Sequence, residues 1–424
     1  MRRGDHDPAA AAAARGSPRV APAPGVERWA GCGIDDLPRD LLLRVLSRLG
    51  ARQLVRTCAV APRWRDLWRD ARCINAVRRE FGELNDSRDG RHEARDSKFQ
   101  RFVSRLLMLR NPTALDQFRL WCAINPSKLE AYCAEANLWI GHALLCNARF
   151  VDVSVRHEEE DVNDMLELDP GVFTSENLTT LRLSGCYLTS DFLGRLRTGC
   201  VLLERLSLQN CYIAGVEISS QTLKFLTIGI DCYFASDTQT TISVPSLVHL
   251  GFFGSVTSRL PSLENMESLL TARVALGCFS ATDTQVDDIL VEDVCRFLQR
   301  LSGVTELDFY FEDISLKMEN NLQWCPKFNN LAVLTLSGWC LHANFYALIV
   351  FLQNSPNLVK LILKLKRHSY ERGRIMGELK ERSFTCEQLK IVEIVCIERD
   401  PIVNSLEKFL LDSGITSCQI HIKN

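Results

Sequence analysis

Apolar residues recur at helical spacing between residues 35 and 68, where the sequence reads DDLPRDLLLRVLSRLGARQLVRTCAVAPRWRDLW. The acidic pair at 35–36 and Pro38 suit the first turn of a helix, and Gly50 suits its end. One side of this helix is apolar, which is typical of an amphipathic helix that packs on a partner element. The apolar positions are Leu41, Leu42, Val45, Leu46 and Leu49.

Two shorter helices are predicted after it. One covers residues 53–58, and the other begins at Pro62 and contains Trp64, Leu67 and Trp68. Three such helices form a small core, and domains below about 40 residues usually need a disulfide, a metal or a partner. The segment offers neither a disulfide nor a set of metal ligands. A partner protein is therefore the expected source of stability.

The next part of the chain is charged and poor in apolar residues. Residues 78–100 predict a solvated linker or an exposed helix, with a loop around 86–90. Apolar residues return at 99–122, where we expect a helix, a turn and then a strand. This stretch separates the three N-terminal helices from the remainder of the chain.

Further along, a leucine pattern repeats. LTTLRLSGCYL begins at Leu178 and LERLSLQNCYI at Leu203, and both fit L-x-x-L-x-L-x-x-C-x-L with Ile accepted at the end. One strand and one return segment are expected per repeat, and no repeat can bury its apolar face alone, so the repeats must stack. Weaker copies begin at Leu223, Leu247, Leu269, Val304, Leu331, Leu358 and Leu389, with an earlier strand expected at Phe150.

The C-terminal region predicts a cap on this stack. Two strands are followed by a helix at Val403–Asp412, which Gly414 ends, and the last segment, SCQIHIK, is expected to cover the open edge of the sheet. The predicted fold class is α/β: a short three-helix unit, then a curved solenoid of leucine-rich repeats, then the cap. Substrate contact is the alternative role for this last region.

The N-terminal helices resemble a known family, the F-box, through which substrate receptors dock on the Skp adaptor of cullin ubiquitin ligases. The Leu37-Pro38 pair, the apolar stripe, Leu54-Val55 and the two tryptophans all appear in the family's order. The adaptor-binding residues that this resemblance implies are Leu37, Pro38, Leu41, Leu42, Val45, Leu46, Leu49, Val55 and Trp64.

Two residues depart from the F-box pattern. Ala61 stands where the family usually has Ser, and Pro62 stands where it has a basic residue. Loss of a Ser cap is expected to cost ~1 kcal/mol, and a proline at the helix start offsets part of that cost. Whether this weakens adaptor docking is left open by the sequence.

The rest of the chain resembles the leucine-rich repeats and the FBD region of plant F-box proteins, the latter through CEQLKIVEI and SLEKFLLDSG. The resemblance implies a non-catalytic substrate receptor of a Skp-cullin-F-box ligase that uses no cofactor and binds a protein substrate. A repeat scaffold that acts outside any ligase is the alternative. The predicted division is a disordered tail at 1–30, an F-box at 31–75, a charged linker and helix at 76–110, repeats at 111–355 and an FBD-like region at 356–424.

Substrate-binding candidates lie between the inward leucines of each strand, where side chains should project from the concave face of the sheet. They mix both charges with aromatic rings, which suits protein recognition better than an anion pocket. The candidates are Arg182, Arg205, His249, Glu306, Asp308 and Tyr310. The identity of the substrate does not follow from any motif.

Charge and hydropathy narrow the compartment and the partners. No stretch approaches the ~18 apolar residues that span a bilayer, and no secretory signal is evident, so a cytosolic or nuclear protein without membrane contact is expected. Residues 1–110 hold 23 Lys and Arg against 14 Asp and Glu, although the whole chain has a net charge of −2. Nucleic-acid binding is disfavoured because these charges alternate with acids and lack stacking aromatics.

Cysteine chemistry and metal binding are also disfavoured. The 17 cysteines contain no CxxC pair, so most should be reduced and buried, including Cys186 and Cys211 of the repeats. No motif ties His249 or His342 to a cysteine as a catalytic base. The acidic run at 157–161 is expected to be a solvated edge rather than a metal site.

Overall fold

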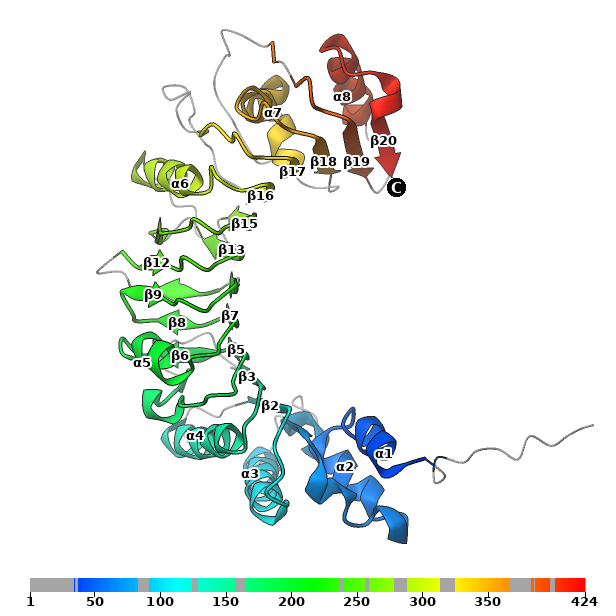
Figure 1. Cartoon of the computed structure of the whole chain (residues 1–424), viewed down its shortest axis with the longest axis vertical. Helices are drawn as coiled ribbons and strands as arrows, with labels where there is room; N and C mark the ends of the chain where they lie inside the picture. The colour runs from blue at the N-terminus through cyan, green and yellow to red at the C-terminus, as the bar shows by residue number, and fades with distance from the viewer. Residues whose placement is uncertain are drawn as a thin grey trace, which may run out of the picture. The chain divides into compact units, whose positions relative to one another are not determined.

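A computed structural model of the chain shows helices at the N-terminal end followed by a column of stacked strands (Figure 1). The chain divides into two compact units, residues 1–42 and residues 43–424. The tail expected to be disordered and the acidic run at 157–161 lie outside the described residues. The described residues are 34, 37–82, 91–123, 129–156, 165–229, 231–235, 239–255, 259–277, 288–312, 325–365, 383–384, 386–396 and 401–423.

The first two predicted helices are confirmed as α1 (Arg39–Leu46) and α2 (Ala51–Cys58). The third differs, because Pro62–Trp64 and Leu67–Asp70 form two separate 3₁₀ turns, η2 and η3. Their backbone bonds run over three residues, as 3₁₀ pieces of this length require. Ala61 is extended and supplies no side-chain cap, so nothing at this end favours a longer α-helix.

The described parts of the charged segment at 78–100 are helical, and the loop expected around 86–90 lies outside the described residues. After β1 (Cys73–Val77), the chain forms η4 (Arg78–Phe81) and, from residue 91, α3 (Arg91–Leu109). Phe99 and Val103 are buried in the core on α3. The helix alternative was therefore right, but its apolar side packs inward instead of lying in solvent.

A parallel sheet dominates the rest of the chain and confirms the predicted solenoid. Its order follows the sequence, so each repeat pairs with the next. Each predicted leucine repeat supplies one strand, β20 covers the far edge as expected, and β1 and β2 extend the sheet before the first repeat. The thirteen strands among the described residues are β1, β2 (Gln117–Ala123), β3 (Phe150–Arg156), β5 (Thr180–Ser184), β7 (Arg205–Gln209), β10 (Phe225–Ile228), β13 (His249–Ser255), β15 (Thr271–Gly277), β16 (Glu306–Glu312), β17 (Val333–Ser337), β18 (Lys360–Leu365), β19 (Ile391–Cys396) and β20 (Ile420–Lys423).

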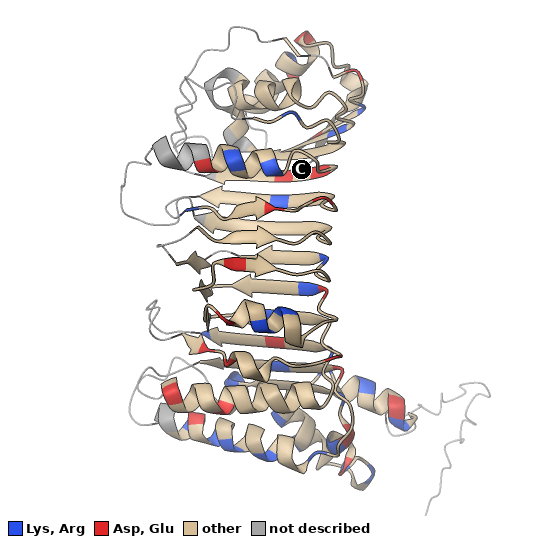
Figure 2. Ribbon diagram, turned by 60° about the vertical axis from the view of Figure 1, so that its left-hand side comes forward, with Lys and Arg blue, Asp and Glu red and all other residues tan. Residues whose placement is uncertain are grey.

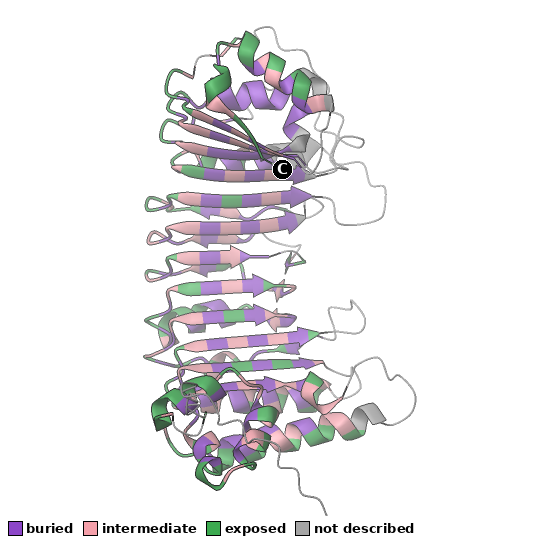
Figure 3. Ribbon diagram, turned by 90° about the vertical axis from the view of Figure 1, so that its right-hand side faces the viewer, coloured by how far each residue is buried: buried purple, intermediate pink, exposed green. Residues whose placement is uncertain are grey.

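Strand register places the leucines in one buried row. Side chains alternate between the two faces of each strand, and Figure 3 shows buried positions alternating with intermediate or exposed ones along individual strands. Because the strands are parallel and in register, the buried position of each strand lies beside that of its neighbour. The inward row runs through Ile74, Phe118, Val151, Leu181, Leu206, Leu226, Leu250, Ala272, Leu307, Leu334, Leu361 and Val392.

The return segments form helices and two small sheets. Helices α4, α5 and α6 lie on one side of the strand column, on the left in Figure 1, and the core lies between them and the sheet. The opposite side of the sheet we call the open face. The helices are α4 (Leu129–Leu145), α5 (Phe192–Gly199), α6 (Asp288–Arg300), α7 (His342–Gln353) and α8 (Pro401–Asp412). The small sheets pair β4 (Leu166–Glu167), β6 (Cys186–Leu188), β8 (Tyr212–Ile213) and β11 (Tyr233–Phe234), and β9 (Glu217–Ser219), β12 (Thr241–Ser243) and β14 (Ser262–Glu264).

Candidate functional site

Exposed apolar side chains mark the first candidate surface. On α1, Leu41 is 43% exposed and Val45 is 46% exposed, and Pro38 just before the helix is exposed as well. A spacing of four residues places two side chains on the same side of a helix. Exposed leucine and valine side chains at this spacing offer a partner an apolar contact.

The other residues predicted to bind an adaptor are less accessible. Leu42, Leu46 and Trp64 are buried, so their side chains are not accessible at the surface. Among the described residues, the Trp64 Nε1 has no hydrogen-bond acceptor, which is costly for a buried donor. The remaining three predicted residues, Leu37, Leu49 and Val55, are half-buried.

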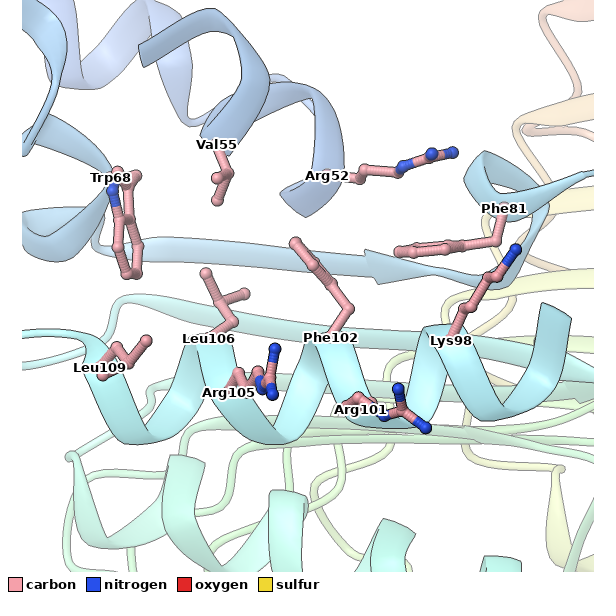
Figure 4. A pocket seen from close by; sticks show the side chains of 10 residues that line it. All are labelled: Arg52, Val55, Trp68, Phe81, Lys98, Arg101, Phe102, Arg105, Leu106 and Leu109. Atoms are coloured by element: carbon pink, nitrogen blue, oxygen red, sulfur yellow. The ribbon is translucent and has the colours of Figure 1, made fainter. Parts of the chain in front are cut away.

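A groove between α2 and α3 forms a second candidate surface (Figure 4). Its volume is about 380 Å³. Phe102 and Leu106 point from α3 toward Val55, and basic positions recur along α3 (Figure 2). The apolar lining is Val55, Trp68, Phe81, Phe102, Leu106 and Leu109, and the basic lining is Arg52, Lys98, Arg101 and Arg105.

Glu80 and Phe81 hold one end of this groove in place. The Arg52 backbone N–H donates to Glu80 Oε2 at 3.0 Å, and the Arg52 guanidinium donates to the Glu80 carbonyl. The same guanidinium lies 4.6 Å from the centroid of the Phe81 ring. Phe102, Leu106 and Leu109 fall in the helix expected from the sequence, but no local pattern predicts the groove, because only the fold brings α2 beside them.

The open face of the sheet holds the predicted substrate-binding residues, and three of them lie close together. Arg205 pairs in register with Phe225, and Phe225 pairs with His249. The Arg205 guanidinium lies 3.4 Å from the Phe225 ring centroid, and the Phe225 and His249 rings stack 4.6 Å apart. Arg182 is exposed on the neighbouring strand β5.

The acidic candidates lie further along the sheet, on β16. Asp308 accepts from Lys364 Nζ at 3.0 Å and lies 3.4 Å from Arg273 Nε, so its charge is already balanced. Glu306 is exposed and Tyr310 is half-buried on the same strand. The fold therefore separates the predicted mixture of charges: arginines gather at β5 and β7, and carboxylates at β16.

The cysteines of the repeats are structural. Cys186 and Cys211 are fully buried, and the Cys211 Sγ donates to the Gln209 carbonyl at 3.2 Å. Burial raises the pKa of the Cys211 thiol, which keeps it protonated and unreactive. Across the part of the chain that the structure describes, no three His, Cys, Asp or Glu side chains gather as a metal site would require. Nor does any described helix have the length and apolar character to cross a membrane.

Comparison with known proteins identifies two domains in the chain. A family model described as "At1g61320/AtMIF1, LRR domain" matches residues 167–398, more than half of the chain, and the F-box domain model matches residues 34–75. The chain belongs to the plant F-box proteins with leucine-rich repeats. The F-box match covers α1, α2 and the two 3₁₀ turns, and the repeat match covers the strands of the parallel sheet from β5 to β19.

The chain is similar to several F-box proteins of Arabidopsis thaliana. F-box/LRR-repeat protein At3g59200 is 25% identical over 80% of this chain and 70% of its own length. F-box/FBD/LRR-repeat protein At4g26340 is 27% identical over 79% of this chain and 77% of its own length. FBD-associated F-box protein At1g66310 is 24% identical over 89% of this chain and 90% of its own length.

Proposed function

We propose that this F-box repeat protein is a non-catalytic substrate-recognition subunit of a Skp-cullin-F-box ubiquitin ligase. Its F-box docks on a Skp-type adaptor, which links it to the cullin, and its repeats hold a protein substrate. The observation that supports this most is the pair of exposed apolar side chains, Leu41 and Val45, on the first helix of a matched F-box. Neighbouring apolar side chains exposed to water mark a surface that a partner protein can cover.

The proposed mechanism is proximity. A substrate held beside a ubiquitin-charged enzyme meets it at an effective concentration of about the millimolar range, without any bond made by the receptor. The continuous parallel sheet suits this role because every strand is hydrogen-bonded to its neighbour, which makes the repeat domain stiff. A stiff receptor holds the substrate at a set distance from the enzyme.

Different F-box residues take different parts in the proposed docking. Pro38, Leu41 and Val45 are exposed and make direct contact with the adaptor. Leu42, Leu46 and Trp64 are buried and keep the helices in position. The half-buried Val55 lies in the groove between α2 and α3, whose apolar lining offers the adaptor further contact area.

Capture of the purified chain on an immobilised Skp adaptor tests this function. We expect the double variant Leu41→Asp with Val45→Asp to weaken capture by about 100-fold, because two carboxylates would be buried in an apolar contact. The matched control is Leu138→Asp on α4, where the leucine is 72% exposed in the repeat domain. This control should bind as the unchanged chain does.

One result would contradict the ligase role, and another would contradict the proposed docking surface. Failure of the unchanged chain to bind the adaptor would leave the alternative of a repeat scaffold that acts outside a ligase. Equal binding by the double variant and the unchanged chain would show that α1 is not the docking surface.

A further inference from the structure

Two neighbouring hollows lie on the open face of the repeat domain. One has a volume of about 460 Å³ and lies over β3, β5, β7 and β10. The other, of about 420 Å³, lies over β1, β2 and β3. Asp152 and Ser154 line both, so the hollows adjoin. We call the two hollows together the basic trough, and its charged lining residues are Arg48, Arg119, Arg182, Arg205 and Asp152.

Positive charge in the trough is unbalanced. All four arginines are exposed, and Asp152 is the one carboxylate among the described residues that line it. Arg119 Nε lies 3.6 Å from Asp152 Oδ2, and Arg182 on the other side also interacts with this carboxylate, but one carboxylate offsets only one positive charge. Three positive charges therefore remain for a ligand.

In the other half of the open face, four basic side chains each have a carboxylate partner. Asp308 lies between Arg273 and Lys364, at 3.4 and 3.0 Å. Glu393 lies between Lys360 and Lys423, at 2.9 and 3.0 Å. The largest excess of positive charge on this face therefore lies over β2 to β7.

Aromatic rings hold the trough arginines ready for binding. The Arg205 guanidinium lies on Phe225, which stacks on His249, and the guanidiniums of Arg119 and Arg182 each lie 5.3 Å from the Phe150 ring centroid. A guanidinium held over a ring keeps its N–H groups free at the edge, and less side-chain entropy is lost when it binds an oxyanion. The arrangement is thus preorganised for carboxylates.

We propose that the basic trough binds an extended acidic segment of the protein substrate, through carboxylates that pair with Arg182 and Arg205 and, beside Asp152, with Arg119. This inference rests on the proposed function, since it names the substrate class for the repeats. The arginines come from β2, β5 and β7, and neighbouring strands lie about 4.8 Å apart. Such spreading fits several Asp or Glu side chains along a peptide better than one compact anion.

Single-stranded nucleic acid fits the trough less well. Its binding depends on aromatic faces that stack on bases. Here Arg119 and Arg182 lie over Phe150, Arg205 and His249 lie against Phe225, and Arg79 lies 5.2 Å from the Trp121 ring centroid. The rings of the trough are already occupied by the chain's own side chains.

Fluorescence polarisation with the full chain tests the proposal. The probe is a fluorescein-labelled peptide of alternating Ser and Glu, and the comparison peptide alternates Ser and Gln. We expect the Glu peptide to bind and the Gln peptide not to bind. Arg182→Gln and Arg205→Gln should each weaken binding about tenfold, because each removes a charge-assisted contact. The matched control, Arg273→Gln, removes an arginine of the same face that is ion-paired with Asp308 and lies outside the trough. It should change the affinity less than about twofold.

Removal of the trough's own carboxylate gives a test in the opposite direction. Asp152→Asn frees Arg119 and adds one net positive charge. Binding of the Glu peptide should tighten about threefold and become more sensitive to salt. An unchanged or weaker affinity for this variant would count against the trough, provided that thermal melting shows it folded.

Several outcomes would overturn the proposal. The Gln peptide could bind as tightly as the Glu peptide, or Arg182→Gln and Arg205→Gln could leave the affinity unchanged. A phosphoserine peptide could bind while the Glu peptide does not. Equimolar oligothymidylate could displace the bound Glu peptide. Adaptor capture separates this failure from failure of the proposed function. If the chain captures the adaptor but ignores the Glu peptide, only the trough inference falls; if it binds the peptide but not the adaptor, only the ligase role falls.

Discussion

Among single side chains, the ion pair between Arg78 and Asp96 joins the end of the F-box region to α3. Arg78 Nε donates to Asp96 Oδ1 at 2.5 Å, and a second guanidinium nitrogen donates to the Gly82 carbonyl at 3.1 Å. The two side chains are 3% and 17% exposed. A buried charge is stable only with its partner, so this pair is sensitive to loss of either member.

We expect Asp96→Asn to lower the free energy of unfolding by about 3 kcal/mol, because the buried Arg78 guanidinium loses its counter-charge. The matched control is Asp116→Asn, which breaks the exposed pair between Asp116 and Arg72, where the side chains are 45% and 60% exposed. That loss should be below about 1 kcal/mol. Urea titration followed by circular dichroism measures both, and equal losses would show that burial does not govern this pair.

At the scale of elements, the turn at Ala61 is the weak end of the F-box. Ala61 has an extended backbone suited to a helix cap but no side chain able to accept a hydrogen bond, and Pro62 follows it at the first position. We expect Ala61→Ser to raise the free energy of unfolding by about 1 kcal/mol, because the hydroxyl adds a side-chain acceptor for the backbone N–H groups at the start of η2.

The control for this prediction is Ala59→Ser, since Ala59 ends α2 and a hydroxyl there caps nothing. Urea titration of both variants gives the comparison. A gain for Ala61→Ser no larger than that for Ala59→Ser would mean that the missing cap does not limit the F-box. Adaptor capture by Ala61→Ser then shows whether the same turn affects docking.

The elements that sequence could predict are those with a local pattern. Strands such as β7 are predictable because buried leucines alternate with polar residues over five positions. Helices α4 and α7 were missed because α7 is apolar on most sides and α4 shows only a weak contrast between its faces. The helical spacing of Tyr132, Ala136, Trp139 and Ile140, all buried on α4, was the available signal.

At the scale of the whole molecule, the basic trough lay beyond what sequence could show. Arg48, Arg119, Arg182 and Arg205 are far apart along the chain, so no local pattern joins them. Their meeting depends on strand register, which places Arg119, Asp152, Arg182 and Ser207 at paired positions on neighbouring strands. Beyond β13 the open face carries both charges close together, with Arg273 and Lys364 beside Asp308.

The repeat domain should respond locally to damage, because each strand of a solenoid contacts only its neighbours. Leu226 on β10 is 1% exposed and lies in the inward row between Leu206 and Leu250. We expect Leu226→Ala to lower the free energy of unfolding by about 2–5 kcal/mol through the cavity it leaves. The matched control, Thr227→Ala, changes the next residue, which faces the open side, and should cost about 1 kcal/mol or less.

Hydrogen exchange of the backbone amides locates this effect. In Leu226→Ala the amides of β7, β10 and β13 should exchange faster, since their shared core is weakened, while those of β18 and β19 keep their protection. Thr227→Ala should leave both groups of strands unchanged. A uniform loss of protection from β2 to β19 in Leu226→Ala would mean that the sheet opens as one cooperative unit.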